Sequence, residues 1–183
     1  MRFNQLDKIT ELIPGEKIVA IREVHDGEDY LRDHFPLFKV MPGVLMLEAL
    51  FQASCCLIQA TDNFRYSLLI LREARNVKFG DFMRPGQCLT ISAEIQKSEG
   101  NCVTIKAAGM KDGSVAVSAK LIISKEDLCS KDPLLADLDE FMRESKRQIL
   151  EKLTLGLAAS QCQLHNETYR GQPPSFKPVN DVN

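Results

Sequence analysis

The chain has 183 residues, 44% of them hydrophobic and 26% charged, a balance typical of a globular protein with one domain and a short addition. A chain of this length buries a sizeable core without cross-links. Its formal net charge of -2 gives no overall attraction to nucleic acid or to an anionic membrane, and its three tyrosines and lack of tryptophan offer few surfaces for stacking bases. We therefore expect neither nucleic acid nor a membrane among its partners.

Metal sites and disulfides are not indicated by the cysteine and histidine pattern. The six cysteines form no C-x-x-C pair and only three histidines are present, so we expect no metal. The first residues, MRFNQ, lack the apolar run of a signal peptide, and no apolar segment is long and uninterrupted enough to span a bilayer. We therefore expect reduced thiols and a cytoplasmic location. The cysteines are Cys55, Cys56, Cys88, Cys102, Cys129 and Cys162.

Two elements are predicted at the start of the chain. Residues 3–13 carry apolar side chains at helix-like spacing, so we expect a helix there. Residues 16–24 alternate instead, which predicts a strand with Ile18, Ala20 and Arg22 on one face.

A turn, a short strand, a loop and a long helix are expected next. Asp26-Gly27 is a strong hairpin-turn signal, so residues 28–33 are expected to pair back as a short strand. Residues 34–43 contain two prolines and show no periodicity, which indicates a loop. The run at 44–60, VLMLEALFQASCCLIQA, consists mainly of helix formers with apolar residues on all sides, which predicts a buried helix.

Four segments that follow this helix read as strands. They are rich in β-branched residues, they alternate well, and turn signals separate them, the last being Asp112-Gly113. A strand pair, a long buried helix and an antiparallel meander together predict an α+β fold in which a sheet wraps one helix. The four segments are 67–79, 87–98, 101–111 and 114–124.

We expect residues 1–124 to form this domain and residues 125–159 to form an accessory helical extension. Asp132-Pro133 is a good helix start, and the helix predicted from about 133 to 153 has one apolar stripe that should pack against something. Residues 160–183 turn polar and are expected to be a disordered tail. The stripe consists of Leu134, Leu138, Phe141, Ile149 and Leu153.

Three residues have chemistry that requires explanation. Glu48 is the only charged residue of the buried helix, so it should be partnered, open to a cleft or protonated, and a raised pKa would make it a general acid. His34 begins the proline-containing loop and is suited to removing a proton near neutral pH. Gly43 opens the helix, where free N–H groups stabilise an oxyanion. The structural alternatives are a solvent-facing Glu48, a packed His34 and a Gly43 that only shapes the helix start.

Together these residues lie in a string that closely resembles a family signature. HFP at 34–36, MPGVLMLEA at 41–49 and QA at 52–53 resemble the pattern G-H-F-P-G-x-P-x-x-P-G-V-L-x-x-E-A-x-A-Q of the FabZ-type 3-hydroxyacyl-[acyl-carrier-protein] dehydratases. Residues 73–86 look like the family's E-A-R-F-x-x-P-V-x-P-G-D segment with extra spacing, and the resemblance covers about residues 16–124.

The resemblance implies a hot-dog fold and the loss of water from a 3-hydroxyacyl thioester. It implies that His34 removes the C2 proton, that Glu48 protonates the departing hydroxyl, and that Gly43, Val44 and Gln52 bind the thioester. The glutamate separates this branch from the FabA-type dehydratase/isomerases, which have an aspartate there. No metal or redox cofactor is implied, since the substrate arrives on the phosphopantetheine arm of an acyl carrier protein (ACP).

The resemblance also implies partners. Hot-dog dehydratases pair their sheets edge to edge, so a homodimer or a higher assembly of dimers is expected. ACPs are acidic, and we expect them to dock on basic residues near the tunnel mouth. The candidates are Arg72, Arg75, Lys78 and Arg84, for which ordinary solvated strand charges are the alternative.

Three positions depart from the family pattern, and they leave the acyl substrate and pathway open. Asp33 and Leu37 replace glycines, and Lys39 replaces a proline. Two other functions therefore stay open at this stage. One is a hot-dog acyl thioesterase, and the other is a non-catalytic hot-dog protein that binds acyl chains.

Overall fold

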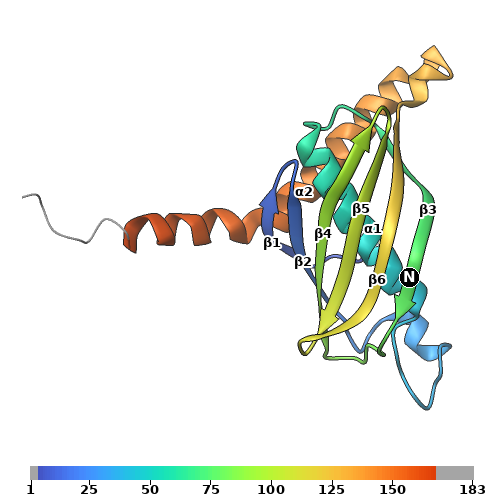
Figure 1. Ribbon diagram of the computed structural model, residues 1–183, viewed down its shortest axis with the longest axis vertical. Coiled ribbons are helices and arrows are strands. Elements are labelled where there is room, and N and C mark those ends of the chain that lie inside the picture. The colour runs from blue at the N-terminus through green and yellow to red at the C-terminus, as the bar shows by residue number, and fades with distance from the viewer. Residues whose placement is uncertain (1–3, 168–183) are drawn as a thin grey trace, which may run out of the picture.

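The computed structural model describes residues 4–167 and shows an antiparallel six-stranded sheet curled around one helix (Figure 1). The strand order is β1-β2-β4-β5-β6-β3, so β1 and β3 form the two edges. This arrangement confirms the predicted α+β hot-dog fold. The elements are β1 (Lys8–Ile13), β2 (Lys17–Glu23), η1 (Asp29–Arg32), α1 (Gly43–Thr61), β3 (Leu68–Phe79), β4 (Cys88–Glu99), β5 (Cys102–Lys111), β6 (Ser114–Glu126), η2 (Leu128–Ser130), η3 (Pro133–Leu135) and α2 (Ala136–Glu167).

The four strands predicted after the central helix form as β3 to β6. Strands β5 and β6 meet at a tight turn in which Asp112 and Gly113 have φ of 49° and 80°, as the Asp-Gly signal predicted. Their register places Val103 opposite Ile123 and Ile105 opposite Leu121. All four of these side chains are buried, so the alternation of each strand presents one apolar face to the helix.

Helix α1 is the core of the domain. Ala49, Leu50, Ala53 and Leu57 have no exposed surface, because they face the concave side of the sheet. Contrary to the expectation that no segment is long enough to span a bilayer, α1 meets the criteria of length and apolar composition. Core helices commonly meet them too, and 56% of this apolar window is buried inside the protein.

Two predictions near the start of the chain are wrong. Within the segment expected to form a helix at 3–13, residues 8–13 form strand β1, whose pairing with β2 shifts register between Ile9 and Glu11. This irregularity breaks the period of two, so the apolar residues acquired a helix-like spacing. The segment expected to pair back as a strand at 28–33 forms the short 3-10 helix η1.

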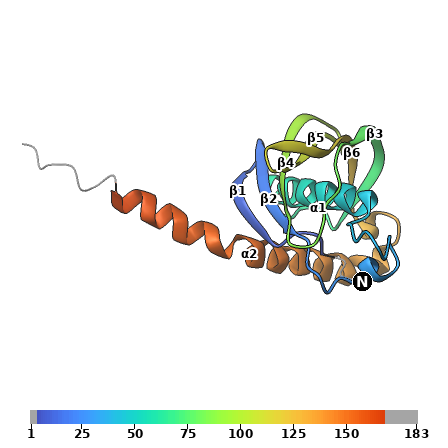
Figure 2. The same ribbon diagram turned by 90° about the horizontal axis from the view of Figure 1, so that it is seen from below.

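Helix α2 covers the open side of α1, runs past β1 and projects beyond the sheet (Figure 2). It reaches Glu167, further than the predicted helix end at 153 and into the segment expected to be a tail from 160. The remainder of that expected tail, residues 168–183, lies outside the described residues. Of the predicted apolar stripe, Leu153 is buried, whereas Leu134, Leu138, Phe141 and Ile149 are exposed on the single chain.

The first turn of α2 is attached to the domain through Asp139. Its carboxylate is fully buried and accepts hydrogen bonds from the Ser67 hydroxyl and from the N–H groups of Leu128 and Cys129, the latter two at 2.9 and 2.8 Å. Burial opposes ionisation, but these donors outweigh it and hold the pKa of Asp139 well below its usual range. Asp139 therefore links α2 to the start of β3 and to the segment after β6.

Candidate active site

His34 lies at the start of the loop that leads into α1, and a carbonyl group fixes its ring. Its Nδ1 is 3.0 Å from the carbonyl oxygen of Val40. A carbonyl oxygen can only accept, so this hydrogen bond requires a proton on Nδ1 and leaves the lone pair of the neutral ring on Nε2. The next residue, Phe35, has a φ of 53°, a strained value for a bulky side chain, and its ring packs 4.4 Å from that of His34.

A cavity of about 410 Å3 joins His34 to the amino end of α1. Gly43 begins the helix, and Pro42 before it supplies no side-chain cap, so the first N–H groups of the helix face this end without a protein side chain to satisfy them. A Cβ at Gly43 would lie 3.1 Å from the Phe79 ring, close enough that the ring would have to move by a few tenths of an ångström. The lining residues are His34, Phe35, Met41, Gly43, Met46, Phe79, Gly80, Asp81 and Phe82.

Glu48 lies in the second turn of α1, where an amide holds its half-buried side chain. Gln52 Nε2 donates a 2.8 Å hydrogen bond to Glu48 Oε1, and Gln52 Oε1 accepts from the N–H of Gln5 at 2.8 Å. A backbone N–H can only donate, so the second contact determines which end of the Gln52 amide faces Glu48. The Glu48 carboxylate is thus oriented by the chain segment that precedes β1.

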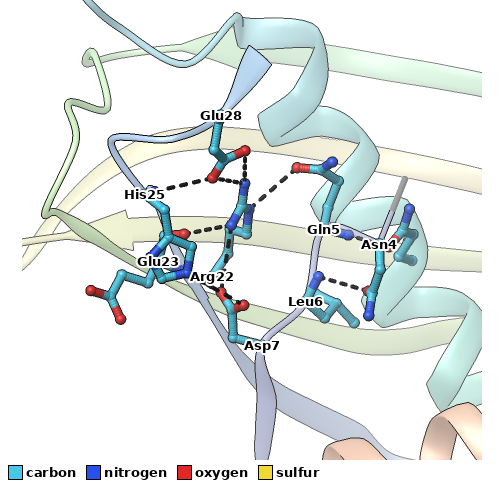
Figure 3. Close-up of polar contacts among 9 residues, drawn as sticks. Asn4, Gln5, Leu6, Asp7, Arg22, Glu23, His25 and Glu28 are labelled. Carbon is cyan, nitrogen blue, oxygen red and sulfur yellow. Dashed lines mark hydrogen bonds and ion pairs between the residues drawn. The ribbon is translucent and has the colours of Figure 1, made fainter. Parts of the chain in front are cut away.

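A buried arginine, Arg22, contacts the side chain of Gln5, as Figure 3 shows. Arg22 has no exposed surface, and its Nε donates to Gln5 Oε1 at 3.2 Å while its Nη atoms bind Glu28 and the carbonyl oxygen of Glu23. Asp7 adds a weaker ion pair at 3.6 Å. Burial would raise the pKa of Glu28, but the hydrogen bonds from Arg22 and from the backbone outweigh it and lower that pKa.

The buried guanidinium of Arg22 is therefore connected to both candidate catalytic residues through hydrogen-bonded neighbours. On one side the connection passes through Gln5 and Gln52 to Glu48. On the other side Glu28 immediately precedes η1, and the carbonyl oxygen of Tyr30 in η1 accepts a 2.8 Å hydrogen bond from the N–H of His34.

Within one chain, His34 and Gly43 line the same cavity and Glu48 does not. Met46 lines that cavity, and Glu48 follows it by two residues, or roughly 200° around the helix, so the carboxylate lies on the opposite face of α1. Gln52 follows Glu48 on that second face. Val44, also predicted for substrate binding, is 68% exposed and lies outside the residues that line the cavity.

The four basic residues expected near the mouth differ in their surroundings. Arg72 pairs with Glu126, and Arg75 pairs with Glu73 at 2.7 Å. Lys78 is exposed. The Arg84 guanidinium lies 4.7 Å from the centroid of the Phe38 ring, and Phe38 in turn packs edge-on against the ring of Phe82 in the cavity wall. Arg84 is therefore the one whose contacts lead directly to the cavity.

Several residues of the site were missed in the sequence. Phe79 and Phe82 line the same cavity as His34, and strand and turn patterns gave no sign that they would lie there. Arg22 was predicted to share a strand face with Ile18 and Ala20, and an arginine among such apolar residues is the signal from which a buried ion pair could have been predicted. The five cysteines described with their surroundings, Cys55, Cys56, Cys88, Cys102 and Cys129, are unpaired.

A curled sheet around one apolar helix, with a histidine loop at the helix start and a carboxylate one turn later, defines a hot-dog protein of the dehydratase type. Residues 1–120 match the model of the FabA-like domain. The chain belongs to this family.

Relatives and solved structures agree with this assignment. The chain is 34% identical over 119 residues to the 3-hydroxyacyl-[acyl-carrier-protein] dehydratase FabZ of Ruminiclostridium cellulolyticum, an alignment covering 65% of this chain and 84% of the relative. The FabZ of Lactobacillus helveticus is 36% identical over 116 residues, covering 63% and 78%. The dehydratase heterocomplex ApeI:P from Xenorhabdus doucetiae shares the fold, with a TM-score of 0.56, 16% identity and coverage of 73% and 90%. The resemblance to FabZ-type dehydratases is confirmed.

Proposed function

We propose that the protein dehydrates 3-hydroxyacyl-ACP to trans-2-enoyl-ACP in fatty-acid or related lipid biosynthesis. The observation that carries this proposal is the hydrogen bond from His34 Nδ1 to Val40, which leaves Nε2 as the basic nitrogen beside the amino end of α1. The curated relatives described above are named for this activity.

The chemistry divides between three groups. His34 Nε2 takes the proton from C2, and the electrons of that C–H bond form the C2–C3 double bond. The C3–O bond breaks as Glu48 gives a proton to the hydroxyl, which leaves as water. The N–H of Gly43 stabilises the negative charge that develops on the thioester oxygen. No metal or redox cofactor is required, and Glu48 rather than aspartate favours dehydration without double-bond isomerisation.

We propose that each site combines His34 of one chain with Glu48 of another. Three features support a homodimer, or an assembly of dimers, that pairs through β3. Glu48 lies on the face of α1 opposite the His34 cavity, β3 is an edge of the sheet, and the other edge, β1, is in contact with α2. The end of β3 also carries Phe79 in the cavity wall.

The proposed substrate arrives on ACP in the cytoplasm. An acidic carrier protein would be attracted by basic residues around the mouth of the cavity. Arg84 is favoured among the four candidates because its guanidinium lies against Phe38 beside the cavity wall, whereas Arg72 and Arg75 are already paired with glutamates.

A single incubation separates the three functions considered. Purified protein is mixed with 3-hydroxybutyryl-ACP and with longer 3-hydroxyacyl-ACPs, and products are identified by mass. A loss of 18 mass units, the molecular mass of water, with the enoyl absorbance of the product is expected, as is hydration in the reverse direction. Free 3-hydroxy acid would instead identify a thioesterase. Unchanged substrate that nevertheless binds would identify an acyl-binding protein, and either result would overturn the proposal.

A further inference from the structure

A second cavity, of about 480 Å3, lies between α1 and α2. Gln52 lines it, and the same Gln52 amide donates to Glu48, so this cavity begins one hydrogen bond away from the proposed catalytic acid. It is distinct from the His34 cavity, with which it shares no lining residue. Its apolar walls are formed mainly by Phe51, Cys55, Cys56, Met142, Ile149 and Leu153.

The floor of the cavity is a continuation of the Glu48 face of α1. Gln52, Cys55, Cys56 and Gln59 follow Glu48 by four, seven, eight and eleven residues, which is the spacing of one helix face. The cavity therefore leads away from Glu48 along the helix, over a distance of roughly 10 Å from residue 52 to residue 59.

The roof is formed by α2 with the same spacing. Met142, Lys146, Ile149 and Leu153 lie at intervals of four, three and four residues, so they occupy one face of α2 opposite the floor. Helix α2 begins at residue 136, whereas the FabA-like domain ends at residue 120. This chain thus encloses the cavity with an element that lies outside the matched domain.

The lining is suited to an uncharged apolar ligand. Burial raises the pKa of Cys56 to about 12 and also raises that of Cys55, so both thiols stay neutral at physiological pH. Lys146 is the one charged residue among those that line it. Its ammonium donates to the carbonyl oxygen of Ser67, and its partial burial lowers its pKa. Apolar walls with a few polar groups are typical of pockets for small ligands, as is a volume of this size.

We infer that this cavity receives the acyl chain of the substrate and that α2 thereby sets the chain-length preference. The inference rests on the proposed function, since a 3-hydroxyacyl group held at Glu48 must place its hydrocarbon tail in an apolar space. Each methylene that enters the cavity should improve kcat/KM by about fourfold until the cavity is full. A short acyl chain would end before it reaches α2.

Two substitutions on α2 test this inference. Ile149→Trp places a large ring at the roof, and Leu138→Trp is the matched control, because Leu138 is on the same helix, is exposed to the same extent (43% against 44%) and lies outside the cavity lining. Turnover of 3-hydroxybutyryl-ACP and 3-hydroxydodecanoyl-ACP is compared. Ile149→Trp should lower kcat/KM for the dodecanoyl substrate at least tenfold and leave the butyryl substrate within twofold. Leu138→Trp should leave both within twofold.

Binding of a dodecanoyl-pantetheine thioether, measured by isothermal titration calorimetry, tests this inference separately from the proposed function. If the wild type binds the thioether and Ile149→Trp does not, the cavity binds acyl chains. That conclusion holds even if the wild type shows no dehydratase activity. If the wild type dehydrates both substrates and Ile149→Trp leaves their ratio unchanged, the inference is wrong and the proposed function stands. Met142→Trp is the second variant should Ile149→Trp fail to fold, as judged by its melting temperature.

Discussion

Gln52 Nε2 donates a 2.8 Å hydrogen bond to Oε1 of Glu48, one helical turn earlier in α1. The other end of the Gln52 amide is occupied by the N–H of Gln5, so the amide cannot rotate without losing a buried contact. One oxygen of Glu48 is therefore held by the protein. We expect the second oxygen, Oε2, to give its proton to the substrate.

Replacing either proposed catalytic residue should remove most of the activity. His34→Ala deletes the base and Glu48→Gln deletes the transferable proton, and general acid–base roles are worth about 10²–10⁴-fold in rate. Enoyl formation from 3-hydroxyacyl-ACP measures the loss, with the melting temperature as a control for folding. Near-normal turnover by either variant would remove that residue from the mechanism.

A mixture of the two inactive variants should recover activity. If each site takes His34 from one chain and Glu48 from another, a mixed dimer contains one site with both residues intact. The variants are unfolded together, refolded together and assayed, and tagged chains show whether mixed dimers have formed. A mixture that contains mixed dimers but stays inactive would mean that the residues act within one chain.

Reversing the charge at Arg84 should weaken ACP binding while leaving the chemistry intact. Arg84→Glu is expected to raise KM for the ACP-linked substrate and to reduce its dependence on salt, because an attractive charge near the mouth becomes repulsive. A short pantetheine thioester should be almost unaffected. Lys106→Glu, at an exposed position on β5, serves as the control. Equal losses on both substrates would instead mean that Arg84 contributes to folding or to the catalytic site itself.

Arg22→Met should be strongly destabilising. The Glu28 side chain is only 6% exposed, and the substitution removes the cation that pairs with its carboxylate. Such a change typically lowers the free energy of unfolding by about 3–5 kcal/mol. Urea unfolding measures the difference from the wild type. Lys17→Met is the control, because it breaks a surface pair with Glu11 and should change stability little. Equal effects of the two substitutions would argue against a stabilising role for the buried network.

Asp139 should make the attachment of α2 sensitive to acid. Its pKa is lowered in the folded protein, so the unfolded chain binds the proton more readily, and the stabilisation is present above the usual Asp pKa of about 3.9 and is lost as the pH falls below it. Melting temperatures of wild type and Asp139→Asn should therefore differ by a nearly constant amount from pH 7 down to about pH 5, and the difference should shrink only as the pH falls below about 4. Asp137→Asn, at an exposed position in the same turn, should show no such convergence if Asp139 is responsible.

Periodic patterns predicted the elements whose contacts are local and regular. The long helix, the four strands after it and the Asp112-Gly113 hairpin all form, because each is specified by its own residues. Strand β1 was mistaken for a helix because the register shift after Ile9 lies in the pairing with β2, which no local pattern reveals. Residues 28–33 were mistaken for a strand because Glu28 forms an ion pair with Arg22, which lies six residues earlier in β2.

The candidate site was predictable in its residue types and less so in its arrangement. His34, Gly43 and Glu48 were proposed from their order along the chain and from the family resemblance. His34 and Gly43 line one cavity, and the catalytic roles of the three residues stay predictions. That Glu48 lies on the opposite face of α1 follows from helix geometry alone. The approach of Phe79 to Gly43 joins segments that are distant in sequence, so only the folded structure reveals it.

Strand β3 pairs with β6 on one side, and within residues 4–167 no strand pairs with its other side. The same strand carries the Phe79 ring that lies against Gly43. Any shift of this strand changes the space between that ring and the amino end of α1. Coupling free energies are reciprocal, so when association at this edge alters ligand affinity in the cavity, the ligand must alter association by the same factor. A dissociation constant for the assembled protein is therefore meaningful only together with the concentration of ligand at which it was measured.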